Sequence, residues 1–209
     1  MRTITEIIKL YTYDELSAEA KENVKQWYLD DADRTDIFTD WIIEDLNFIF
    51  GKNDLNVQYS LGYCQGDGLN IYGFINAENI LDCLKKHNTG AQLKEFENIL
   101  TEKETRTILN YAENCGKIEI PQNRHYCYSL ADYIEFADNW ENELYYAGYK
   151  NINTEAINKF EKLVKEIFGK LDSDFETDGY NYFYEIEDDE LSEICDCNNW
   201  EFTENGNLY

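Results

Sequence analysis

The segment from Leu55 to Ile75 constrains the fold more than any other part of the chain. Apolar residues occupy most odd-numbered positions on both sides of the stretch Gln65-Gly-Asp-Gly68. Alternation with a period of two is the pattern of strands that bury one face. Because glycines can adopt the positive φ that tight loops need, the segment predicts an antiparallel β-hairpin.

The same alternation limits the register of the hairpin. If the odd positions of both strands face one core, paired residues must both be odd, as in Tyr63 with Leu69. The loop must then contain an odd number of residues. A three-residue loop (Gln65 to Asp67) or a five-residue loop (Cys64 to Gly68) satisfies this condition, and a loop of two or four residues does not.

The rest of the chain predicts helices and a few further strands. Strands are expected at Thr3 to Tyr11, Lys117 to Ile120 and Arg124 to Phe136. Helices are expected after the N-cap Ser17, from Thr39 to Phe50, from Ala77, from Ala91, after the capping box Thr101 to Glu104, from Thr154 to Leu171 and from Glu190 to Ile194. The fold class is therefore α+β, a small antiparallel sheet built on the 55–75 hairpin and packed by several amphipathic helices. No linker rich in Gly, Ser or Pro divides the chain, so one globular domain is expected over residues 1–209, with a possible acidic subregion at 150–209.

The formal net charge is -25, from 43 acidic and 18 basic residues. A surface this negative argues against direct binding to nucleic acid or to anionic membranes, since both are polyanions. It favours a basic protein partner, including nucleases whose channels hold DNA or RNA, although such charge also serves solubility alone. The acidic residues expected at such a contact lie in the C-terminal third: Asp172, Asp174, Glu176, Asp178, Glu187, Asp188, Asp189 and Glu190.

Six cysteines occur without a secretory segment and without a run of 18 apolar residues. This combination predicts reduced thiols in the cytoplasm of a bacterial host cell. Cys195-Asp-Cys197 has the wrong spacing for a structural zinc site, and only two histidines exist as nitrogen ligands. No metal or other cofactor is predicted.

Two further motifs invite a chemical interpretation. Gln65 and Asp67 lie on the glycine-rich loop, which lacks the Lys-Ser or Lys-Thr of a P-loop and is either a structural turn or a partner-binding loop. Residues 174–185 match the oxygen-ligand spacing of an EF-hand loop, but Glu176 and Asn181 depart from its pattern. No catalytic residues are assigned, and a small metal-dependent enzyme using one of these segments is the least favoured alternative.

Four passages together resemble a family of phage and prophage proteins of unknown activity. They are Tyr13-Asp-Glu-Leu-Ser-Ala-Glu-Ala-Lys21, the Gln65-Gly-Asp-Gly68 hairpin, Arg124-His-Tyr-Cys-Tyr128, and Asn199-Trp-Glu-Phe-Thr-Glu-Asn-Gly206. The family loop commonly reads Ser-Gln-Gly-Asp-Gly-Ala, whereas this chain has Cys64 and Leu69 at its ends. Some members are labelled as antitoxin-like, so the resemblance implies an origin more than a mechanism.

These observations lead to two binding hypotheses. The first is a phage-derived, anti-CRISPR-like inhibitor that evades host defence. It binds a basic defence nuclease or nucleoprotein, such as a CRISPR effector, in part as a nucleic-acid mimic. The second is an antitoxin-like protein that neutralises a toxin by stoichiometric binding. The sequence leaves open the identity of the partner, the oligomeric state, and whether the acidic surface or the hairpin tip makes the contact.

Overall fold

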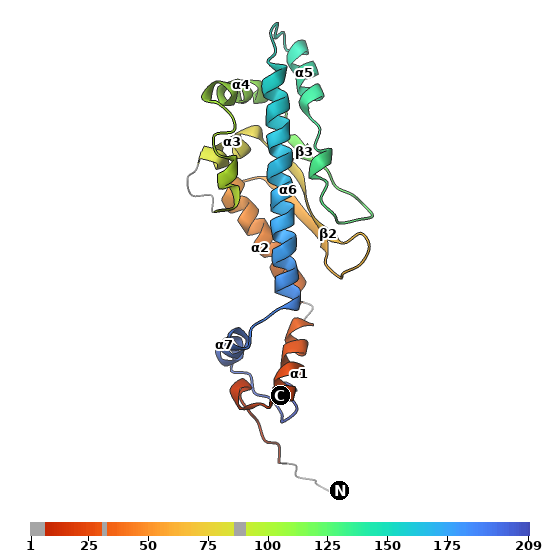
Figure 1. Cartoon of the computed structure of the whole chain (residues 1–209), viewed down its shortest axis with the longest axis vertical. Helices are drawn as coiled ribbons and strands as arrows, with labels where there is room; N and C mark the ends of the chain where they lie inside the picture. Colours follow the sequence, from red (N-terminus) through yellow and green to blue (C-terminus); the bar gives the residue numbers. More distant parts are fainter. Residues whose placement is uncertain (1–6, 31–32, 86–90) are drawn as a thin grey trace, which may run out of the picture. The chain divides into compact units, whose positions relative to one another are not determined.

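The computed structural model describes residues 7–30, 33–85 and 91–209. The chain divides into two compact units, whose elements are labelled in Figure 1. Unit 1 comprises residues 1–37 together with 180–209, and unit 2 comprises residues 38–179. A single domain over residues 1–209 stays a prediction, and each unit is described by itself below.

Unit 2 contains a three-stranded antiparallel sheet. Its strands are β1 (Asp54–Ser60), β2 (Gly68–Ile75) and β3 (Ile118–Ile120), in the order β1-β2-β3. The strand expected at Lys117 to Ile120 is therefore confirmed. Together with the helices, this sheet confirms the predicted α+β class and the 55–75 hairpin at its centre.

The hairpin has the predicted parity and a longer loop than predicted. Tyr59 pairs with Leu69 and Leu55 pairs with Gly73, so odd positions do oppose odd positions. The strands, however, separate after Ser60, and the loop is residues 61–67 rather than three or five residues. Pairing stops there because the loop satisfies its backbone amides through Asp67, as described below, and not through further ladder bonds.

Helices surround this sheet within unit 2. They are α3 (Ala77–Lys85), α4 (Glu102–Ala112) and α5 (Ala137–Tyr146), with 3-10 turns η2 (Ala91–Phe96) and η3 (Ala131–Tyr133). Most of α2 (Asp33–Phe50) and of α6 (Thr154–Tyr184) also belongs to unit 2, whereas residues 33–37 and 180–184 belong to unit 1. The helix expected from Ala91 is thus only a 3-10 turn. The predicted capping box is confirmed, because Thr101 Oγ1 accepts from Glu104 N (3.3 Å) and Glu104 Oε2 accepts from Thr101 N (2.7 Å).

Helix α6 is the longest element, with 31 residues. It continues past the predicted end at Leu171 because its apolar stripe continues: Phe175 is fully buried, and Gly179 lets the helix approach Leu61 and Phe38. A Cβ atom at Gly179 would lie 2.4 Å from Leu61 Cδ1. Residues 174–184 are therefore helical, and the EF-hand-like loop considered for 174–185 is not formed.

The strand expected at Arg124 to Phe136 is wrong. This segment is a loop followed by η3, and two buried polar side chains hold it against β2 in place of a ladder. Asn70 accepts from Leu130 N (2.8 Å) and donates to Pro121 O (3.0 Å). Asp172 Oδ1 accepts from Ile71 N (2.7 Å), and Ser129 Oγ donates to its Oδ2.

Unit 1 is built on η1 (Tyr13–Glu15), α1 (Ala18–Leu29) and α7 (Asp188–Asn198). The predicted N-cap is confirmed, since Ser17 Oγ accepts from Ala20 N at 3.2 Å. Its core includes Val24, Leu191 and Phe202, and Phe202 forms bridges with both Tyr11 and Leu208. Of the strand expected at Thr3 to Tyr11, residues 3–6 lie outside the described residues, and residues 7–11 contribute only the bridge at Tyr11.

Among the described helices, none contains an apolar stretch of the length needed to span a lipid bilayer.

Candidate functional site

The charge of the chain is concentrated in unit 1. This unit holds 18 of the 43 acidic residues and only 5 of the 18 basic residues, although it is the smaller unit. Residues 180–209 contain nine Asp or Glu and no Lys or Arg. Unit 1 therefore has a much higher density of negative charge than unit 2.

Helix α7 displays this charge on its outer surface. Leu191 and Cys195 face the core, whereas Asp189, Glu193 and Asp196 are exposed at helical spacing on one face. The 11 residues of α7 carry five acidic side chains along about 16 Å of helix axis, since each residue adds about 1.5 Å. On the exposed face itself, Asp189, Glu193 and Asp196 follow one another about every 5 Å along the axis, compared with about 3.4 Å per phosphate along one strand of DNA. We call the exposed acids of α7 the α7 acidic face: Asp188, Asp189, Glu190, Glu193 and Asp196.

Unit 1 provides few cations to balance these carboxylates. Within its described residues the only ion pair joins Lys21 Nζ and Asp14 Oδ1 at 3.9 Å, whereas the other seven ion pairs of the described chain lie in unit 2. Arg34 is only 6% exposed and packs between the rings of Tyr28 and Tyr182 instead of facing the surface. The acids of the α7 acidic face therefore take part in none of these ion pairs.

Local stability explains part of this arrangement. Acids in the first turn of α7, such as Asp188, interact favourably with the positive end of the helix dipole. Asp188 also accepts a hydrogen bond from Tyr13 (3.4 Å), and burial followed by the charge of Asp188 raises the pKa of Tyr13 to about 12. Asp196 lies in the last turn, where a negative charge is unfavourable and no base compensates it. Helix stability therefore does not account for the charge at that end.

The eight predicted contact acids do not form one described surface. Glu187, Asp188, Asp189 and Glu190 are exposed in unit 1, whereas the other four belong to α6 in unit 2. Asp172 is 1% exposed, which corrects the prediction that it faces a partner. Asp174 is half-buried and paired with Lys170 at 2.9 Å. The contact roles of Glu176, of Asp178 and of the unit 1 acids stay predictions.

Asp67 organises the hairpin loop from inside. Its Oδ2 accepts from Gly62 N (2.7 Å) and Cys64 N (2.6 Å), and its Oδ1 accepts from Ser60 Oγ (2.5 Å). The Ser60 hydroxyl and the Cys64 and Gly62 amides hold the pKa of Asp67 below its usual value. The sequence suggested that Asp67 contacts a partner. In the structure its carboxylate instead holds the loop in its conformation, whereas Gln65 is exposed at the tip.

Two tyrosines from the 121–130 segment complete this tip. Tyr126 and Tyr128 stack with ring centroids 5.7 Å apart, and Cys127 N donates to Gly66 O at 3.1 Å. Gly66 has φ +90°, and a Cβ atom there would lie 2.3 Å from Tyr126 Cδ1. We define the tip surface by its exposed residues: Tyr63, Gln65, Arg124, His125, Tyr126 and Tyr128. Sequence reasoning missed these tyrosines because it placed them in a strand.

No group of three or more His, Cys, Asp or Glu side chains within the described ranges is arranged to hold a metal ion. All six cysteines are free thiols, of which Cys64 and Cys197 are exposed.

Comparison with protein families, with curated proteins and with solved structures finds no match to this chain. Function must therefore be argued from the two surfaces themselves.

Proposed function

We propose that the protein is a non-catalytic inhibitor that binds a basic nuclease or nucleoprotein of a bacterial defence system through the α7 acidic face. In this proposal the chain originates from a phage, and the partner is an effector of the CRISPR type or another defence nuclease. The observation that carries the proposal is the set of five exposed acids on α7, none of which makes an ion pair among the described residues.

Electrostatics explains why such a face would bind a basic channel. Like charges three or four residues apart on a helix destabilise it by about 0.2 to 0.5 kcal/mol per pair. Asp189 with Glu193 and Glu193 with Asp196 are pairs of this kind. A partner that places Lys and Arg opposite these carboxylates relieves the repulsion and gains opposite-charge contacts, which also speed association.

The tip surface offers a different type of contact. Exposed tyrosines packed beside a loop that is held by its own hydrogen bonds can bury large area with little loss of conformational freedom, which is typical of binding anchors. We assign specificity to this surface, with Gln65 among its contacts and Asp67 as the residue that positions it.

The test begins with a pull-down of the tagged full-length chain in a defence-bearing bacterial host. The captured partner is then purified, and its binding is measured in competition with its own DNA or RNA. We expect a basic nucleic-acid-binding protein, and we expect nucleic acid to displace the inhibitor. A captured toxin without a nucleic-acid channel would favour the antitoxin alternative. A partner that binds nucleic acid and this protein at the same time would overturn the proposal that the protein mimics nucleic acid.

A further inference from the structure

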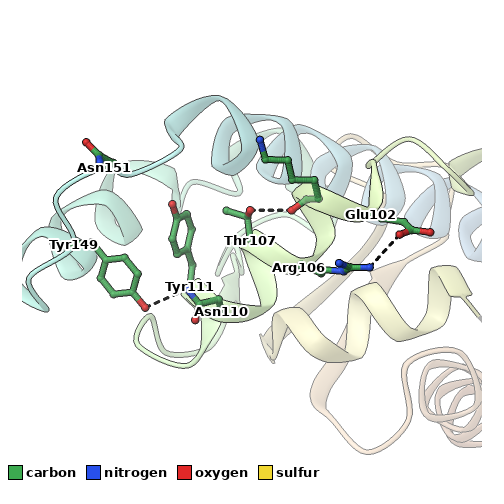
Figure 2. Close-up of a pocket in the computed structure, with 8 residues that line it drawn as sticks. Glu102, Arg106, Thr107, Asn110, Tyr111, Tyr149 and Asn151 are labelled. Carbon is green, nitrogen blue, oxygen red and sulfur yellow. Dashed lines mark hydrogen bonds and ion pairs between the residues drawn. The ribbon is translucent and has the colours of Figure 1, made fainter.

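A cavity of about 600 Å³ lies in unit 2 beside helix α4. Figure 2 shows that one wall is formed by α4, with Arg106 and Glu102 at one end and Asn110 and Tyr111 at the other. Tyr149, from the segment that connects α5 to α6, closes the second end. A volume of this size falls within the range of about 300 to 1,000 Å³ that is typical of small-molecule sites.

The aromatic end of the cavity is pre-formed. The rings of Tyr111 and Tyr149 meet edge to face with centroids 5.5 Å apart. Tyr111 is 5% exposed, and its hydroxyl accepts from Asn153 N at 2.9 Å. Tyr149 is held from the other side, because its hydroxyl contacts Asn110 Nδ2 (3.3 Å) and Asn114 Nδ2 (3.2 Å).

These contacts leave hydrogen-bond donors without acceptors. A phenol hydroxyl can accept twice and donate once, and the Tyr149 oxygen already accepts from two amide groups. Its proton is therefore still available. If the Asn110 amide is turned over, Tyr149 donates to the amide oxygen and the NH2 group of Asn110 becomes the available donor instead. In either arrangement, the Tyr149 hydroxyl or the Asn110 NH2 group can donate a hydrogen bond to an acceptor atom of a ligand.

Lys103, Arg106 and Glu102 also line the cavity and together carry one net positive charge. Lys103 has no ion-pair partner among the described residues. Arg106 is paired with Glu102 at 3.1 Å, but their side chains are 80% and 89% exposed, so the pair is weak and a bound anion can replace it. Glu104 is bound elsewhere, by the Thr101 amide and by Lys159, and these contacts lower its pKa to about 2.

We propose that this cavity binds a nucleoside monophosphate or a ligand of the same chemistry, an aromatic ring bearing an anionic phosphate. The phosphate lies between Lys103 and Arg106, and the base lies against Tyr149 with its acceptors facing the hydroxyl and the Asn110 amide. Arg106 and Asn110 are four residues apart, about 6 Å along the helix, so that the two ends suit one ligand of this length. This site is independent of the α7 acidic face.

The test uses calorimetric titration of the full-length protein with AMP, GMP, CMP and UMP, and with inorganic phosphate and adenosine as the two halves of the ligand. We expect at least one nucleotide to bind with a Kd below about 1 mM and at least tenfold more tightly than phosphate or adenosine. The double variant Lys103→Gln, Arg106→Gln should weaken binding at least tenfold. Tyr149→Phe removes the hydroxyl and should weaken binding about threefold to tenfold.

Lys52→Gln is the matched control, because Lys52 is an exposed cation of unit 2 that does not line the cavity. Its Kd should equal that of the unmodified protein. Circular dichroism of each variant establishes that it is folded. The proposal is overturned if no nucleotide binds, if phosphate alone binds as tightly as the nucleotides, or if Lys52→Gln weakens binding as much as the cavity variants.

Discussion

Asp172 is a buried carboxyl group whose replacement by asparagine should change how stability depends on pH. It is 1% exposed, and burial raises its pKa to about 7 even though hydrogen bonds from Ser129 and Ile71 act in the opposite direction. Its pKa in an unfolded chain is about 3.9. The folded protein therefore holds a proton on Asp172 at pH values where the unfolded chain has released it.

The sign of the effect follows from proton linkage. The contribution of Asp172 is most favourable below about pH 4, where both states are protonated, and it declines as pH rises towards the folded pKa of about 7. One pKa unit corresponds to about 1.4 kcal/mol. Between pH 5 and pH 7.5 the carboxyl group should lower the free energy of unfolding by about 2 to 3 kcal/mol.

Asp172→Asn mimics the protonated form, since its amide oxygen can accept from Ile71 N and its NH2 group can donate to Ser129 Oγ. The variant should therefore gain about 2 to 3 kcal/mol relative to the unmodified protein when pH is raised from 5 to 7.5. Asp172→Leu leaves the Ile71 amide unpaired and should be destabilised by about 1 to 3 kcal/mol at pH 5. Because leucine does not titrate either, this variant should show the same relative gain of about 2 to 3 kcal/mol when pH is raised to 7.5.

Urea unfolding followed by tryptophan fluorescence measures these differences at both pH values. Asp132→Asn is the matched control, because it makes the same substitution at an exposed aspartate of the same unit. A difference between Asp172→Asn and the unmodified protein that stays constant from pH 5 to pH 7.5 would refute the reasoning, since it would mean that Asp172 is ionised throughout.

Three further predictions concern the loops and the thiols. Gly66→Ala should lower Tm more than Gly148→Ala, because both glycines have φ near +90° but only the first would place a Cβ atom against a neighbouring ring. In Asp67→Ala, hydrogen exchange of the loop amides should accelerate. In the unmodified protein the same acceleration should occur only on acidification below the usual pKa range of an aspartate, because hydrogen bonds lower the pKa of Asp67. Iodoacetamide labelling followed by mass spectrometry should modify Cys64 rapidly and Cys115 only after unfolding, because burial raises the pKa of Cys115 to about 11.

The sequence predicted the hairpin because alternation is a local signal, and it predicted the parity of the register for the same reason. It did not predict the loop length, since that depends on the hydrogen bonds that Asp67 makes to Ser60, Gly62 and Cys64. When a carboxylate accepts these hydrogen bonds in place of the β-ladder, the hydrophobic pattern of the sequence does not change, so the pattern does not predict where the ladder ends. The false strand at 124–136 has the same origin, because Asn70 and Asp172 hold that segment by side chains.

The length of α6 was underestimated for a related reason. After Leu171 the chain becomes rich in acids and tyrosines and contains Gly179, and these residues favour a loop locally. Packing reverses this preference, since Phe175 is buried and Gly179 allows close contact with Phe38. The charge of the candidate site was visible in the sequence, whereas its division between two units and the burial of Asp172 required the structure.

The central claim is that the α7 acidic face takes the place of nucleic acid on a basic partner. It is tested by neutralising four acids of that face and comparing them with four exposed, unpaired acids of unit 2. The face variant carries Asp189→Asn, Glu190→Gln, Glu193→Gln and Asp196→Asn; the control carries Asp40→Asn, Glu44→Gln, Glu78→Gln and Glu113→Gln. Both variants change the net charge by the same amount.

The decisive measurement is the Kd for the purified partner as a function of salt concentration. We predict that the face variant binds at least tenfold more weakly at about 0.15 M salt and with a shallower salt dependence, whereas the control retains most of the affinity. Equal affinity and equal salt dependence for the face variant and the unmodified protein would contradict the account.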